Sequence, residues 1–151
     1  MAFVGNLLWF VLGGGIIAWL LWVLFGLVLA ITIVGLPFAM AAFRISGFAA
    51  FPFGKELVDA RLLGEERILG TGLANFLWVV LAGFWLAISH VLSGISYCLT
   101  IIGIPFGFAH FKLAAVSFAP LGKRPVTTEL ATQARNQTAG IELQKRRIDG
   151  T

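Results

Sequence analysis

The stretch that decides the fold occurs twice: residues 32–44 read TIVGLPFAMAAFR, and residues 100–112 read TIIGIPFGFAHFK. Each copy joins an apolar run to a Gly-x-Pro step and carries one basic residue, Arg44 or Lys112. Upstream, the motif Asn-x-Leu-Trp also occurs twice, at residues 6–9 and 75–78. Chance similarity between apolar segments would not reproduce Asn, Trp, Gly, Pro and a basic residue in order. The sequence therefore predicts an internal duplication.

Composition and the placement of charge indicate an integral membrane protein. Hydrophobic residues make up 59% of the 151 residues, charged residues only 12%, and the mean hydropathy is +0.94. Arg44 is the only charged residue between positions 1 and 54, and Lys112 is the only one between 68 and 121. Both stretches far exceed the roughly 20 apolar residues that a membrane helix needs.

The duplication and the charges divide the chain into four parts. Each apolar half is long enough for two crossings of a hydrocarbon core roughly 30 Å thick, and it then returns to the side from which it entered. We expect an all-α integral membrane protein, built from two tandem parallel helical-hairpin repeats with about four membrane segments. The parts are a first membrane hairpin repeat (3–54), a charged cytoplasmic linker (55–70), a second membrane hairpin repeat (71–122) and a basic cytoplasmic tail (123–151).

The linker suits a short interfacial helix, and the tail suits either a weak helix or disorder. Six basic residues in the tail mark its side of the membrane as cytoplasmic, because Lys and Arg accumulate there. The N-terminus is then cytoplasmic as well. We expect a multi-pass protein of the bacterial inner membrane.

The Gly-x-Pro steps predict very tight turns between helices. Gly35 and Gly103 would end one helix in the left-handed conformation, and Pro37 and Pro105 would begin the next. The first helix, about 4–33, is long enough to kink, and we expect the kink at the three glycines 13–15. The helix after each turn is short for a full crossing and could be re-entrant.

The basic residue in each second helix has two interpretations. Arg44 and Lys112 could extend along lipid to reach phosphates at the membrane surface. Alternatively, they could line a water-filled cavity or pore that favours anions, with His110 nearby. No Asp or Glu lies in either apolar half to pair with them.

A polar stripe marks one face of the helix before the second turn, at helical spacing: Ser89, Ser93, Ser96 and Thr100. Small residues in such a stripe favour close helix packing with local hydrogen bonds. A hydrophilic pore wall is the alternative. Asn6 and Asn75, each near a Trp, are interpreted as helix caps beside membrane-interface aromatic anchors.

The motifs of enzymes and metal sites are absent from the sequence. There is no Ser-His-Asp arrangement, no paired carboxylate motif and no phosphate-binding glycine loop. His90 and His110 lack the further ligands that a metal site needs. We expect no enzyme activity, no metal, no cofactor and no nucleic-acid partner.

The chain resembles a known family. Asn-x-Leu-Trp, the run Thr-Ile-Ile-Gly-Ile-Pro-Phe-Gly at 100–107, Phe-Lys-Leu-Ala at 111–114 and Pro-x-Gly at 120–122 are similar to the YccF family of bacterial inner membrane proteins. The resemblance covers residues 3–124 and implies a duplicated inner membrane component domain. It implies no activity and no catalytic residues, and the first copy departs from it at Leu36, Ala39 and Met40.

Two functions follow as hypotheses. The first is an oligomeric pore or transport element with an anion preference, because four short helices enclose little space in one chain. The second is a non-transporting accessory or scaffold protein, whose basic tail engages lipid or a partner. In both cases we expect membrane lipids as partners and a homo-oligomer.

Overall fold

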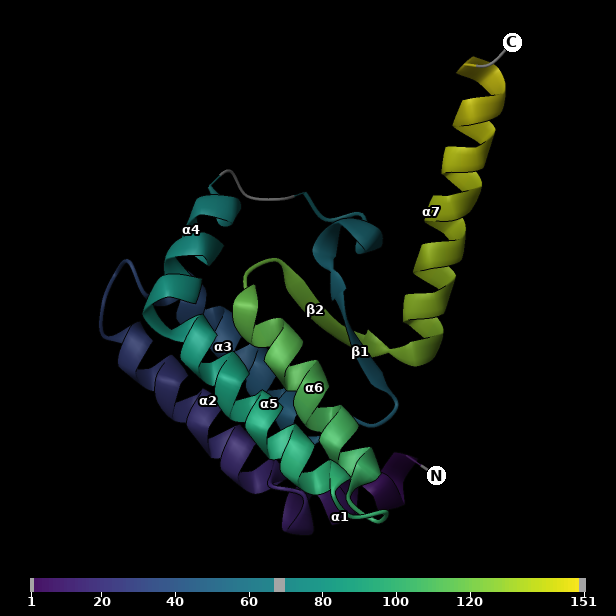
Figure 1. Cartoon of the computed structure of the whole chain (residues 1–151). Helices are drawn as coiled ribbons and strands as arrows, with labels where there is room; N and C mark the ends of the chain where they lie inside the picture. The colour runs from purple at the N-terminus through teal and green to yellow at the C-terminus, as the bar shows by residue number, and fades with distance from the viewer. Residues whose placement is uncertain (1, 67–69, 150–151) are drawn as a thin grey trace.

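The computed structural model describes residues 2–66 and 70–149, and this part of the chain is mainly α-helical with a two-stranded sheet (Figure 1). The first half begins with α1 (Ala2–Leu12) and α2 (Gly15–Ala30), which meet at an angle of 74°. Gly14 lies in the break with φ of 81°, a conformation that a side chain disfavours. The kink expected at residues 13–15 is therefore confirmed.

The turn into α3 (Leu36–Ala50) is closed by a threonine and a glycine. The N–H of Gly35 donates to Oγ1 of Thr32 at 3.0 Å, and the threonine hydroxyl donates to the carbonyl of Leu29 at 3.2 Å. In the second half, Gly103 and Thr100 repeat this arrangement before α6 (Ile104–Phe118), with an N–H···Oγ1 distance of 3.1 Å.

The conformation expected for these two glycines is wrong. Gly35 and Gly103 have φ of −77° and −79°, in the right-handed region. Glycine is required here because the backbone passes too close to the preceding helix for a side chain. A Cβ at Gly35 would overlap the carbonyl oxygen of Leu29, and one at Gly103 would overlap that of Tyr97. Pro37 and Pro105 do lie in the first turn of their helices, as expected.

The second half begins with one nearly continuous helix. It consists of α4 (Thr71–Trp78), a π-helical turn η2 (Val79–Gly83) and α5 (Phe84–Cys98). Within the described residues, this 28-residue run is long and apolar enough to cross a membrane, while α1 and α2 qualify only as a bent pair. The 15-residue helices α3 and α6 would extend roughly 22 Å, short of a core about 30 Å thick.

The two hairpins, α2–α3 and α5–α6, point in opposite directions. We call the end of each hairpin opposite its turn the base. Trp9 lies at the base of the first hairpin, and its ring centroid is 6.2 Å from that of Phe106, which follows the turn of the second hairpin. Reciprocally, Trp78, at the base of the second hairpin, stacks at 5.4 Å on Phe38, which follows the turn of the first. The expected parallel arrangement is therefore wrong, because parallel hairpins would bring turn to turn and base to base.

The linker and the tail meet in a sheet. Strand β1 (Lys55–Asp59) pairs antiparallel with β2 (Lys123–Thr127), with Leu57 opposite Pro125 at the centre. A 3-10 turn, η1 (Ala60–Leu63), follows β1. The interfacial helix expected in the linker is thus wrong over residues 55–59, because these residues obtain backbone partners from β2, 68 positions further along the chain.

The tail continues as α7 (Thr128–Asp149), so the helical alternative applies to it rather than disorder. Figure 1 shows α7 extending away from the helical hairpins. Ala131 and Ala134 are its buried residues, near the end that adjoins the sheet.

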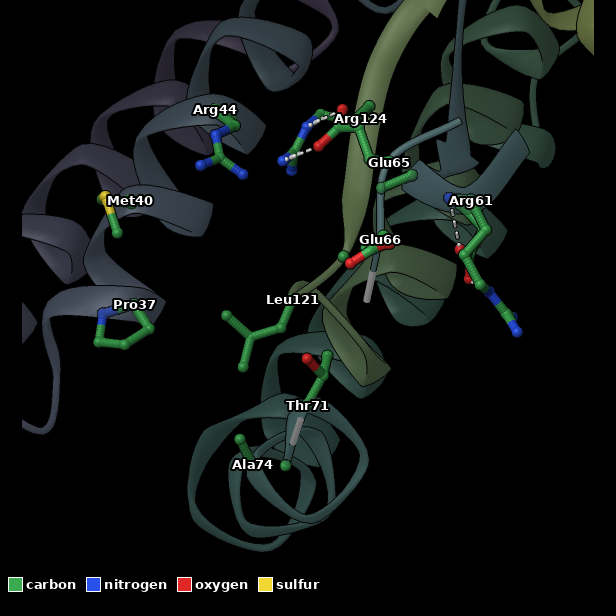
Figure 2. Close-up of a pocket in the computed structure, with 14 residues that line it drawn as sticks. Pro37, Met40, Arg44, Arg61, Glu65, Glu66, Thr71, Ala74, Leu121 and Arg124 are labelled. Atoms are coloured by element: carbon green, nitrogen blue, oxygen red, sulfur yellow. Dashed lines mark hydrogen bonds and ion pairs between the residues drawn. The ribbon is translucent and has the colours of Figure 1, made fainter. Parts of the chain in front are cut away.

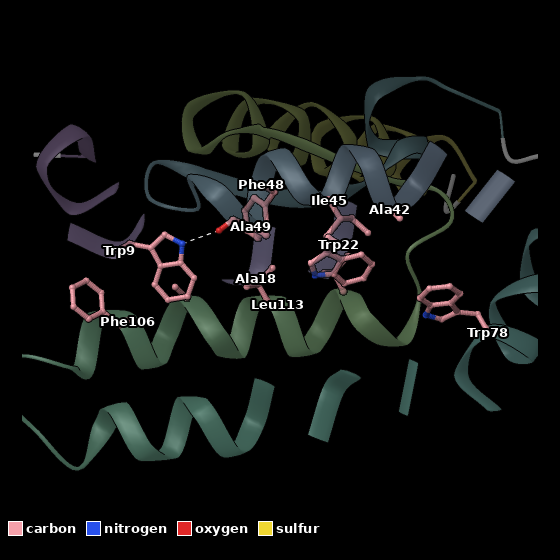
Figure 3. Close-up of a cluster of buried hydrophobic side chains, with 12 residues drawn as sticks. Trp9, Ala18, Trp22, Ala42, Ile45, Phe48, Ala49, Trp78, Phe106 and Leu113 are labelled. Carbon is pink, nitrogen blue, oxygen red and sulfur yellow. Dashed lines mark hydrogen bonds between the residues drawn. The ribbon is translucent and has the colours of Figure 1, made fainter. Parts of the chain in front are cut away.

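The buried core lies where α3 and α6 meet, and three tryptophans from α1, α2 and α4 pack against it (Figure 3). Leu57 of β1 packs on the same cluster. The sheet therefore covers α3 and α6. Figure 1 shows α2 on the side of the helices away from the sheet.

Candidate functional site

In the part of the chain that the structure describes, charged side chains lie outside the long apolar helices. No charged residue occurs in α1, α2, η2, α4 or α5, or in the two hairpin turns. These segments instead expose many large aliphatic and aromatic side chains. Exposure is greatest at the turns, where Ile33 and Ile101 are 87% and 88% exposed. We call this surface the apolar face.

Arg44 lies outside the apolar face, in an open pocket of about 280 Å³ between α3 and the sheet side of the molecule (Figure 2). We call it the Arg44 pocket. Arg124 of β2 lines the same pocket and binds Glu65, with Nη2 2.5 Å from Oε2. Among the described residues, Arg44 has neither a hydrogen bond nor a carboxylate within 4 Å.

Lys112 occupies a second pocket, also of about 280 Å³, beside β1. Its Nζ donates to the carbonyl of Lys55 at 3.4 Å. Lys112 and Arg44 therefore both lie on exposed positions next to the sheet, but in two separate pockets. The structure does not bring these two predicted site residues together.

His110 points into the core, whereas Lys112 is exposed. His110 is buried, and its Nδ1 lies 3.1 Å from Nδ1 of His90 on α5. The ring of Tyr97 stacks on the His110 ring with centroids 5.3 Å apart, and the Trp9 ring meets it edge-on at 4.9 Å. His110 is thus a core residue that lines neither the Arg44 pocket nor the Lys112 pocket. No group of three metal-binding side chains occurs in the part of the chain described.

The serine stripe makes local hydrogen bonds. Ser89, Ser96 and Thr100 each donate to a carbonyl of α5 three or four residues earlier in the chain, and Ser93 is half-buried. All four lie away from the Arg44 and Lys112 pockets.

The Asn-x-Leu-Trp motifs close the ends of the hairpins, a role that the sequence reading missed. Nε1 of Trp9 donates to the carbonyl of Ala49 at 2.7 Å, and Asn6 bonds both N–H and carbonyl of Phe53. Trp9 is fully buried, so the expected interfacial anchor is wrong for this residue.

The second motif makes the same contacts. Nε1 of Trp78 donates to the carbonyl of Ser117 at 2.7 Å, and Asn75 bonds Leu121 through both backbone groups. The available signal in the sequence was that Asn-x-Leu-Trp and a later Pro-x-Gly step both occur once in each half. It indicated a shared role but not the carbonyls that the side chains would meet.

Ion pairs join the linker to the tail. Arg135 of α7 lies 2.6 Å from Glu56 of β1, in addition to the Arg124–Glu65 pair. Within the linker, Arg61 donates to Asp59 at 3.0 Å. This hydrogen bond lowers the pKa of the Asp59 carboxyl from 3.8 to about 2.

Comparisons with known proteins identify a family and two relatives. A family model, YccF, described as the inner membrane component domain, matches residues 4–55 and again residues 73–123. Two relatives, each called inner membrane protein YccF, come from Escherichia coli (strain K12) and Shigella flexneri. Each is 38% identical over 141 residues, which is 89% of this chain and 93% of the relative. No solved structure matches.

Uncharged helices with exposed aliphatic residues, together with these matches, define an integral membrane protein of mainly helical fold. More particularly, the chain belongs to the YccF family of inner membrane proteins.

Proposed function

We propose that the protein is a non-transporting membrane scaffold that lies within the cytoplasmic leaflet of the inner membrane. Its apolar face would contact hydrocarbon, and its sheet and α7 would be presented to the cytoplasm. The observation that supports this most is the opposite orientation of the two hairpins.

Because the hairpins point in opposite directions, the base of the first hairpin and the base of the second lie at opposite ends of the helical layers. The linker leaves the base of the first hairpin and leads to the base of the second. If the helices stood upright in the membrane, β1 and β2 would have to run across it. Lys, Arg and Asp each cost at least about 2.5–3.5 kcal/mol at mid-bilayer, so the five such residues in these strands and η1 would cost on the order of 10 kcal/mol. They are Lys55, Asp59, Arg61, Lys123 and Arg124.

Helices that lie along the membrane avoid this cost. Two stacked layers of helices, each about 10 Å thick, reach roughly 20 Å into a hydrocarbon core of about 30 Å. The layer of α2 and α5 would then lie in hydrocarbon. The layer of α3 and α6 would hold Arg44 and Lys112 at the level of the headgroups, where basic side chains are favoured.

This arrangement keeps the linker and the tail on one side. The basic tail makes that side cytoplasmic. Multi-pass topology with four crossings is replaced, in this proposal, by two hairpins that enter one leaflet only.

An oligomeric anion pore is the second candidate. Its supporting observation is that Arg44 and Lys112 are both exposed, with no carboxylate within 4 Å among the described residues. Because one chain holds them in separate pockets, a pore would need several copies around a common axis. Chloride flux into liposomes that is lost in the double variant Arg44→Ala, Lys112→Ala would favour the pore over the scaffold.

The position of the hairpin turns decides between the arrangements. Single cysteines replace Ile33 or Ile101 in a Cys98→Ser background, and a membrane-impermeant maleimide is added to spheroplasts or to inverted vesicles. We expect neither turn to be labelled from the periplasmic side. Gln144→Cys in α7 serves as the control and is expected to react only in inverted vesicles, and denatured protein should react at every site. Labelling of both turns from outside would establish four crossings, and labelling of one turn would establish an inverted pair.

A further inference from the structure

The Arg44 pocket combines charges with an apolar wall, and this combination identifies a class of ligand. We propose that it binds a phospholipid with a primary-amine headgroup, of the phosphatidylethanolamine type. The proposal rests on the membrane location of the family and holds whether the helices span the membrane or lie along it.

The charges of the pocket balance, but they are not all satisfied within the protein. Six ionised side chains line it, three basic and three acidic. Two ion pairs, Asp59–Arg61 and Glu65–Arg124, account for four of them. Among the described residues, the remaining two, Arg44 and Glu66, have no hydrogen bond or ion pair. Figure 2 shows them on different walls of the pocket, Arg44 on α3 and Glu66 after η1.

One free cation and one free anion are complementary to a zwitterion. The guanidinium of Arg44 offers several N–H donors to a phosphate, and the carboxylate of Glu66 accepts from an ammonium. A headgroup with phosphate alone would leave the carboxylate without a partner and close to a like charge. A choline headgroup keeps the positive charge but has no N–H to donate.

The rest of the wall indicates a lipid rather than a soluble phosphate compound. Pro37 and Met40 of α3, Ala74 of α4 and Leu121 form an apolar part of the pocket wall. Met40 is 54% exposed, and α3 leads from this point to the exposed turn of the first hairpin. An acyl chain could therefore continue from the headgroup along this surface. A pocket of about 280 Å³ suits the headgroup alone.

The Lys112 pocket provides an internal contrast. Its charged residues are Lys112, Lys123 and Glu56, and the glutamate is already paired with Arg135. Both side chains without a carboxylate partner are basic, so this pocket offers nothing for an ammonium. The preference for an amine is expected only at the Arg44 pocket.

Titration calorimetry tests the proposal with the full-length protein in detergent. The probes are dihexanoyl phosphatidylethanolamine, the matching phosphatidylcholine and phosphatidylglycerol, and glycerophosphoethanolamine, which lacks acyl chains. We expect the ethanolamine lipid to bind most tightly. Arg44→Gln should weaken its binding about tenfold, as expected for loss of a charge-assisted hydrogen bond. Arg44→Lys should recover part of that loss.

Further variants separate the two headgroup contacts from nonspecific effects. Glu66→Gln should abolish the preference for ethanolamine over choline, and Arg146→Gln on exposed α7 should change nothing. Equal binding of the ethanolamine lipid to Arg44→Gln and to the unaltered protein would overturn the proposal. So would equal affinity for ethanolamine and choline lipids. Binding of glycerophosphoethanolamine as tightly as the lipid would contradict a lipid ligand.

Discussion

Leu57 and Pro125 face each other at the centre of the two-stranded sheet, and they are equivalent residues of the two halves, 68 positions apart. The pairing is symmetric about this central pair. Lys55 pairs with Thr127, and their equivalents in the other half, Lys123 and Asp59, pair with each other. A pseudo-two-fold axis through this central pair also relates the Trp9–Phe106 contact to the Trp78–Phe38 contact. The sheet and the opposite orientation of the hairpins thus express one relationship.

The indole of each motif tryptophan satisfies a carbonyl at the end of a helix. Trp9→Phe and Trp78→Phe should each lower the free energy of unfolding by about 1–3 kcal/mol, because the carbonyls of Ala49 and Ser117 lose their buried donors. Thermal unfolding in detergent measures this. Trp85→Phe is the matched control, since Trp85 is 67% exposed. Effects no larger than that of the control would contradict the role.

The break between α1 and α2 depends on the backbone of Gly14. Gly14→Ala should destabilise the protein by about 1–2 kcal/mol because its φ is 81°. Crowding is not the cause, since the nearest atom to an added Cβ is 3.5 Å away. Gly47→Ala, in the last turn of α3 with open space around it, should instead stabilise by up to about 1 kcal/mol. Equal effects in both variants would refute this explanation.

The Asp59–Arg61 pair predicts a local dependence on pH. The pKa of Asp59 is lowered from 3.8 to about 2, so its contribution to stability is complete above pH 4 and is lost as the pH falls towards 2. Carboxyl chemical shifts across this range measure the titration. Arg61→Gln should return the pKa of Asp59 towards 3.8, whereas Arg146→Gln should leave it unchanged. A midpoint near 4 in the unaltered protein would count against the pair.

The attachment of α7 depends on its buried alanines. Ala131→Asp places a charge at a position with no exposed surface, so α7 should detach and trypsin should cleave after Arg135 more rapidly. Ala139→Asp, at an exposed position of the same helix, should leave the cleavage rate unchanged. Similar rates in both variants would show that α7 is not anchored at Ala131.

Sequence reasoning located the elements better than their contacts. It found the turns at Gly35-Leu36-Pro37 and Gly103-Ile104-Pro105 and the kink at residues 13–15, because Gly and Pro act on the adjacent backbone. It did not predict that β1 pairs with β2, because the pairing of strands 68 positions apart leaves no trace in either strand alone. The buried His90–His110 contact was also missed, because the packing of α5 on α6 decides which side chains meet between these helices.

The sequence by itself determined that this is a membrane protein of the YccF type with two similar halves, because apolar length, charge placement and repeated motifs are properties of the chain. Only the tertiary structure decided that the hairpins point in opposite directions and that Arg44 and Lys112 lie in separate pockets beside a shared sheet. The physical reason is that each hairpin satisfies its own backbone hydrogen bonds. The packing of large side chains such as Trp9 and Trp78 across the pseudo-two-fold axis then selects how the halves meet.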